Sequence, residues 1–140
     1  METCSRPSNG SRRRSKLTEI FPKIDTVILR VRGLQNSRRW YENKLGLVAG
    51  FIGEKEPIVV FKIGNTPTSL TIYEVKKNDK LPIKGESQHS WPIFYSEDIK
   101  KSHETLRNKD VKVDKIEGDS ESQWFSFYDP DGNKLEACHY

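Results

Sequence analysis

An internal repeat with a spacing of 65 residues constrains the fold of this chain more than any other feature of its sequence. Residues on the expected inner side of two helical segments keep that spacing: Leu34 with Ile99, Ser37 with Ser102, and Tyr41 with Leu106. The predicted helices span residues 37–45 and 99–109, and Asn36 and Asp98 are their expected N-caps. Each helix is preceded by one predicted strand and followed by three. Neither unit closes its own sheet, so each is expected to need the other to form a core.

Predicted β-strands surround both helices, because runs of β-branched and apolar residues alternate with turns rich in Gly, Pro and Asn. The strands span residues 25–31, 47–52, 57–63, 68–75, 91–96, 111–116, 123–128 and 134–139. Asp129-Pro130-Asp131-Gly132 joins the last two strands and has the composition of a tight turn. The sequence therefore predicts an α+β fold of two βαβββ modules. Their curved mixed sheets are expected to form a shared cup, with the helices outside.

The 140 residues suffice for one domain preceded by a tail. Residues 1–18 are polar and basic and are expected to be disordered, whereas residues 19–140 are expected to form the domain. Its modules are predicted at about residues 19–76 and 88–140, with a linker over 77–87. The formal net charge of +4 resides in the tail, and the remainder is neutral. This distribution argues against a specific nucleic-acid-binding domain, which needs basic charge on a folded face.

No apolar run is long enough to cross a membrane, and the first 30 residues contain no apolar stretch typical of a signal peptide. The two cysteines, Cys4 and Cys138, show no spacing typical of a disulfide framework or a zinc site. A cytoplasmic location without membrane contact is therefore expected.

The predicted strand and helix over residues 24–47 end in WYENKLGL, and residues 127–140 read FYDPDGNKLEACHY. These two segments resemble the vicinal-oxygen-chelate superfamily, which includes glyoxalase I, extradiol dioxygenases, and fosfomycin- and bleomycin-resistance proteins. The resemblance covers residues 19–140. It implies the fold predicted above and a homodimer, because members often complete the site with a second chain. It does not select a reaction, since this fold hosts many activities.

In the metal-using members, four side chains from the first and last strands of the two modules converge on a divalent ion. The resemblance places these positions at Thr26 and Glu74 in the first module and at Trp91 and Glu136 in the second. Glu74 and Glu136 are suitable ligands, but Thr26 and Trp91 are not usual ones. His89 is a further candidate ligand. The expected cofactor is one divalent ion (Zn, Ni, Fe or Mn) or none, and Glu136 is the candidate catalytic residue.

Strand alternation predicts which other side chains line the cup. If Glu74 and Glu136 face it, so do Ile72 and Cys138. The first strand would add Thr26, Ile28 and Arg30. Arg30 would then either form a salt bridge with a glutamate or bind an anionic ligand. Aromatic residues at alternating positions would complete the lining, either as a stacking surface or as core: Trp91, Tyr95, Trp124 and Tyr128.

Three functions follow from this reading. The favoured one is a glyoxalase/bleomycin-resistance-family protein that binds a small molecule in an aromatic cup with an incomplete metal site. The alternative is a metal-dependent lyase, isomerase or dioxygenase that uses Glu74 and Glu136 as ligands. The third is a protein-interaction domain whose cup is filled by side chains. The sequence leaves open whether the chain is an enzyme.

Overall fold

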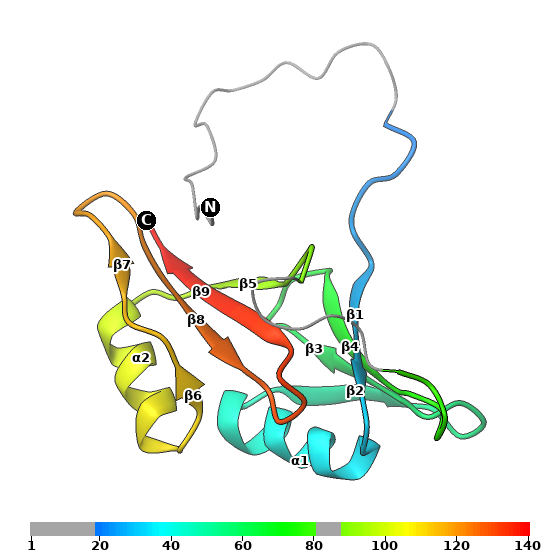
Figure 1. Ribbon diagram of the computed structural model, residues 1–140. Helices are drawn as coiled ribbons and strands as arrows, with labels where there is room; N and C mark the ends of the chain where they lie inside the picture. The colour runs from blue at the N-terminus through cyan, green and yellow to red at the C-terminus, as the bar shows by residue number, and fades with distance from the viewer. Residues whose placement is uncertain (1–18, 81–87) are drawn as a thin grey trace.

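The computed structural model describes residues 19–80 and 88–140, which form two βαβββ modules (Figure 1). The first contains β1 (Thr26–Val31), α1 (Leu34–Leu45), β2 (Val48–Ile52), β3 (Ile58–Lys62) and β4 (Ser69–Glu74). The second contains β5 (Ile93–Tyr95), α2 (Ile99–Asn108), β6 (Lys112–Val113), β7 (Glu117–Gly118), β8 (Gln123–Tyr128) and β9 (Lys134–His139). The predicted α+β class is confirmed. The predicted tail and residues 81–87 of the predicted linker lie outside the described residues.

Each module contributes one open, mixed sheet. The strand order is β1-β4-β3-β2 in the first sheet and β5-β9-β8-β6 in the second, where β7 also pairs with β8. The first strand of each module runs parallel to the last, and the other pairings are antiparallel. Figure 1 shows α1 along one side of the first sheet and α2 along the outer side of the second.

The core lies between each sheet and its helix and is continuous through both modules. Its buried strand residues are Leu29, Val31, Val59, Phe61, Leu70 and Ile72 in the first module and Phe125, Phe127, Leu135 and Ala137 in the second. They pack with Tyr41 of α1 and with Ile99 and Leu106 of α2. We call the side of each sheet that carries these residues its helix face, and the opposite side its open face.

The helix ends differ in part from the prediction. The first helix begins at Leu34, three residues early, and its N-cap is Gly33 rather than Asn36. Gly33 has no side chain to cap the helix, and the carboxylate of Glu74 instead accepts a 2.8 Å hydrogen bond from the Leu34 backbone N–H. The second helix is capped by Asp98 as predicted, since its side chain accepts from the Lys101 N–H.

The turn between β8 and β9 fastens the second module to the first. The carboxylate of Asp129 accepts hydrogen bonds from the Tyr41 hydroxyl on α1 (2.8 Å) and from the side-chain amide of Asn133 (2.8 Å). The same amide donates to the backbone carbonyl of Arg30 on β1 (2.9 Å). The turn is therefore part of the junction between modules.

In the part of the chain that the structure describes, no helix is long and apolar enough to span a membrane.

Candidate functional site

The 65-residue repeat extends into the last strand of each module and defines equivalent positions there. Ile28 of β1 pairs with Thr71 of β4, and Ile93 of β5 pairs with Glu136 of β9. Ile28 and Ile93 are 65 residues apart, and so are Thr71 and Glu136. The first-module equivalent of Glu136 is therefore Thr71 and not Glu74.

Two residues predicted to line the cup lie on the wrong face for that role. Ile72 is fully buried in the core beneath α1, and Glu74 bonds to the first turn of α1. Their assignment rested on pairing Glu74 with Glu136, which are 62 residues apart instead of 65. Side chains alternate between the two faces of a strand, so a register error of three residues, an odd number, moves a side chain to the opposite face. The prediction that Glu74 and Ile72 face the cup is therefore wrong.

Each open face carries one hydrogen-bonded pair at the same place in its module. In the first module the hydroxyls of Thr26 and Thr71 lie 2.7 Å apart. In the second, the indole Nε1–H of Trp91 donates to Oε1 of Glu136 over 3.3 Å. The partners are 45 residues apart in both pairs, and the pairs are related by the 65-residue repeat. With the corrected register, these four residues occupy the positions that the resemblance assigns to metal ligands.

This set of side chains does not fit a divalent metal ion. Thr26 and Thr71 are neutral and bonded to each other, and the indole N–H of Trp91 is a donor that offers no lone pair. Glu136 is left as the single carboxylate, whereas a divalent ion needs several carboxylate or imidazole ligands. Within residues 19–80 and 88–140, no group of three or more His, Cys, Asp or Glu side chains could hold a metal ion. His89, the further candidate, is exposed just before β5.

Glu136 lies in an environment that favours its neutral form. The residue is fully buried, and its Oε2 has no hydrogen-bond partner among the described residues. Burial raises the pKa of its carboxyl group, which the hydrogen bond from Trp91 and the positive charge of Lys134 only partly oppose. The Lys134 ammonium lies 3.9 Å from the centre of the Trp91 ring, a cation–π contact. The carboxyl group, the indole and the ammonium thus form one cluster.

Lys134 was not among the predicted site residues. It precedes Glu136 by two positions on the same strand, so the two side chains share a face. That alternation is visible in the sequence and could have identified it.

Arg30 lies on the open face of the first sheet, as predicted, but does not pair with a glutamate. Its guanidinium group is 4.8 Å from the centre of the ring of Tyr73, its neighbour in the ladder. Its Nε is buried without a hydrogen-bond partner, and among the described residues no ion pair joins it to Glu74 or Glu136. Thr26 and Ile28 share this face, and Ile28 is 53% exposed. The predicted salt bridge is therefore absent from the part of the chain that the structure describes.

The remaining predicted aromatic residues are spread along the open face of the second sheet. Trp124 and Tyr95 both lie beside Cys138 in the ladder, and Tyr128 lies beside Lys134. The Tyr95 ring packs against the rings of His139 and Tyr140 at the end of β9. The Tyr128 hydroxyl donates to Asp114. Tyr128 is therefore a direct neighbour of the cluster of Trp91, Lys134 and Glu136, whereas Tyr95 and Trp124 lie two residues beyond Glu136 along β9.

Comparison with known proteins agrees with this architecture. Residues 23–137 match the Glyoxalase/Bleomycin resistance protein/Dioxygenase superfamily. No curated protein matches the chain.

Three solved structures illustrate the likeness, and at their low identities they show the fold alone. A superfamily member from Sphaerobacter thermophilus has a TM-score of 0.72 and 18% identity, covering 87% of this chain and 100% of its own. A glyoxalase family protein from Enterococcus faecalis has a TM-score of 0.69 and 21% identity, and the match covers 86% of this chain and 99% of that protein. An antibiotic binding protein from a Streptomyces species has a TM-score of 0.70 and 17% identity, and the match covers 87% of this chain and 98% of that protein.

Proposed function

The chain belongs to the Glyoxalase/Bleomycin resistance protein/Dioxygenase superfamily, and from this premise we propose that it binds a small organic molecule at the Trp91–Glu136 pair without a resident metal ion. The observation that carries the proposal is the identity of the four equivalent side chains. Three are Thr26, Thr71 and Trp91, and only Glu136 resembles a metal ligand. A site of this composition favours stacking and hydrogen bonding over Lewis-acid catalysis.

The cluster suggests what kind of ligand would bind. An aromatic or other flat apolar group would stack on the indole of Trp91. A polar group of the ligand would meet the carboxyl group of Glu136, whose Oε2 makes no hydrogen bond to a described residue. Because burial raises the pKa of Glu136, its carboxyl group keeps a proton that it could donate to a ligand carbonyl up to a higher pH than a solvent-exposed glutamate would.

Glu136 is fully buried, so a ligand reaches its carboxyl group only if a neighbouring side chain moves, and we infer that this side chain is Trp91, which bonds to the carboxyl group. Trp91 precedes β5, so its backbone is outside the sheet ladder and its displacement breaks no strand pairing. Such a displacement would exchange one hydrogen bond and one cation–π contact for contacts with the ligand.

We also propose that two copies form a homodimer that covers the exposed apolar side chains of the open faces. Val48 and Phe51 lie on edge strand β2 and are 65% and 57% exposed. An edge strand with exposed apolar residues favours pairing with another chain. Sedimentation of the wild type and of Phe51→Arg tests this. Dissociation of a wild-type dimer by the substitution supports the proposal, and a monomeric wild type at micromolar concentration overturns it.

A thermal-shift screen followed by calorimetric titration tests the small-molecule proposal. The library would contain aromatic compounds with carbonyl or hydroxyl groups, including natural-product antibiotics because one structural neighbour is an antibiotic binding protein. For a compound that raises Tm, Trp91→Leu is expected to weaken binding about tenfold, since stacking on one aromatic residue contributes about 1–3 kcal/mol. Trp40→Phe, in α1 on the other side of the first sheet, is the control and should bind normally.

Three outcomes would overturn the proposal. The first is a screen in which no compound stabilises the protein, and the second is ligand binding that Trp91→Leu leaves unchanged. The third is metal retention. If the protein incubated with Mn, Fe, Ni or Zn keeps about one equivalent after washing, and Glu136→Ala loses it, the metal-dependent enzyme becomes the better explanation.

A further inference from the structure

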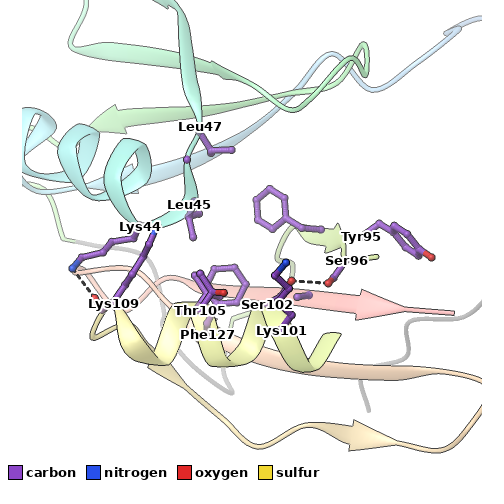
Figure 2. A pocket seen from close by; sticks show the side chains of 14 residues that line it. Lys44, Leu45, Leu47, Tyr95, Ser96, Lys101, Ser102, Thr105, Lys109 and Phe127 are labelled. Carbon is purple, nitrogen blue, oxygen red and sulfur yellow. Dashed lines mark hydrogen bonds between the residues drawn. The ribbon is translucent and has the colours of Figure 1, made fainter. Parts of the chain in front are cut away.

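A pocket lies at the junction of the two modules, on the helix side of the second sheet (Figure 2). Its volume is about 390 Å3, which is large enough for a small organic molecule. The end of α1 and the start of β2 form one wall, and β5 and α2 form the other. It is separate from the Trp91–Glu136 pair, because Phe127 and Ala137 in its lining belong to the helix face.

The pocket has an apolar floor that could hold a ring or a short aliphatic chain. Leu45 and Leu47 come from the first module, and Phe94 and Phe127 come from the second. Figure 2 shows Leu45 and Leu47 above the gap and Phe127 below it. The Tyr95 ring points away toward the end of β9, which leaves the space between these apolar residues open.

The polar part of the lining carries positive charge and hydroxyl groups. Three lysines line the pocket, Lys44, Lys101 and Lys109, and none of its lining residues is Asp or Glu. Lys44 and Lys109 each donate one hydrogen bond to a backbone carbonyl at a helix end, and an ammonium group has two further donors.

The side-chain hydroxyls of Ser96 and Ser102 add one further hydrogen-bond donor. Their oxygen atoms are 2.7 Å apart, so one hydroxyl donates to the other. The second proton of this pair can turn toward a ligand.

From these observations we propose that this pocket binds a small amphipathic organic anion. The apolar body of the anion would lie between Leu47 and Phe94. Its carboxylate, sulfonate or phosphate group would meet Lys101 and the hydroxyl of Ser102. An anion is favoured because the lining offers cationic and neutral donors without a competing carboxylate. This site is independent of the proposed function, since it uses neither Trp91 nor Glu136.

The test is a titration of 15N-labelled full-length protein with naphthalene-1-sulfonate, followed by NMR amide shifts. Saturable shifts are expected at Leu45, Leu47 and Thr105, with weaker binding as salt increases. The uncharged analogue 1-naphthalenemethanol should bind at least fivefold more weakly. Parallel titrations with 1-naphthoate and 1-naphthyl phosphate show which anionic group is preferred.

Two single substitutions separate a specific site from general attraction to a basic surface. Lys101→Gln is expected to raise the Kd at least fivefold. Lys100→Gln removes the same charge from the neighbouring position of α2, which does not line the pocket, and should leave the Kd unchanged.

The proposal is overturned if the lining amides do not shift, or if both variants weaken binding equally. It is also overturned if the neutral analogue binds as tightly as the anion. Shifts confined to Trp91 and the open-face strands would reject this pocket and support the proposed function instead.

Discussion

Lys44 and Lys109 exchange hydrogen bonds between the carboxyl ends of the two helices. The ammonium of Lys44 donates to the Lys109 carbonyl over 2.6 Å, and that of Lys109 donates to the Asn43 carbonyl over 3.1 Å. The two lysines are 65 residues apart and are therefore equivalent in the repeat. The modules thus meet about an approximate twofold relationship at this point. Carbonyls at helix ends lack partners within the helix, so each lysine satisfies one of them.

Removal of one of these lysines is expected to loosen the junction between modules. Lys109→Met should lower the free energy of unfolding by about 0.5–1.5 kcal/mol, the usual contribution of one hydrogen bond. Urea denaturation measures this change. Lys100→Met, which removes an exposed lysine on the same helix, is the control and should stay within about 0.5 kcal/mol of the wild type. If the two substitutions changed the free energy of unfolding equally, the hydrogen bonds between the helix ends would make no specific contribution to stability.

The repeat predicted much of the fold because periodicity and turn composition report on local structure. Asp98 caps the second helix, Gly46 ends the first, and the turn at Asp129 joins the last two strands, all as expected. The predicted strand over residues 111–116 is different. Only Lys112–Val113 pair with β8 there, and Glu117–Gly118 form a separate short strand. Alternating residues indicate an extended chain, but they do not specify where it pairs.

The candidate site was predicted less well because residue identity was given more weight than spacing. Two glutamates near strand ends suggested equivalent ligands, although the helices had already established a spacing of 65 residues. Applied to Glu136, that spacing gives Thr71, which bonds to Thr26 on the open face. The contact between Lys134 and Trp91 depends on side-chain directions on β9 and in the segment before β5, and it could not be derived from spacing alone.

The hydroxyl of Tyr41 is expected to contribute strongly to stability. It is buried and donates to the carboxylate of Asp129 at the junction between modules. Tyr41→Phe removes a hydrogen-bond donor to this carboxylate and should lower the free energy of unfolding by about 1–3 kcal/mol. Tyr128→Phe is the matched control, because it removes an exposed hydroxyl that donates to Asp114, and its cost should be clearly smaller. Thermal unfolding of both variants provides the comparison.

Gly46 is expected to be required for its backbone conformation alone. Its φ is +70°, and a Cβ built on it meets no atom within 4 Å. Gly46→Ala should therefore cost about 1–2 kcal/mol from left-handed strain, without any steric clash. Gly33→Ala is the control, since φ there is −121° and the added Cβ would only touch that of Asn36 at 3.8 Å. Urea denaturation should show a loss at position 46 and a change within about 0.5 kcal/mol at position 33.

Glu136 is expected to make stability depend on pH. Burial raises its pKa above the ordinary value of 4.5, so the folded protein binds this proton more tightly than the unfolded chain. The resulting stabilisation is fully present below pH 4.5 and is lost as the pH rises through the raised pKa. Glu136→Gln keeps a neutral side-chain carbonyl that accepts the hydrogen bond from Trp91, and it does not titrate. The variant should therefore not lose stability as the pH rises, and at neutral pH it should be more stable than the wild type.

Urea denaturation between pH 4 and pH 8 measures the difference between Glu136→Gln and the wild type. The difference should grow with pH by no more than about 1.4 kcal/mol per pH unit, the limit for one proton. Comparison at each pH cancels the contribution of Asp129, whose pKa is also raised by burial. Glu104→Gln, at an exposed position of α2, should show the same pH dependence as the wild type. A constant difference across the pH range would mean that folding leaves the pKa of Glu136 unchanged.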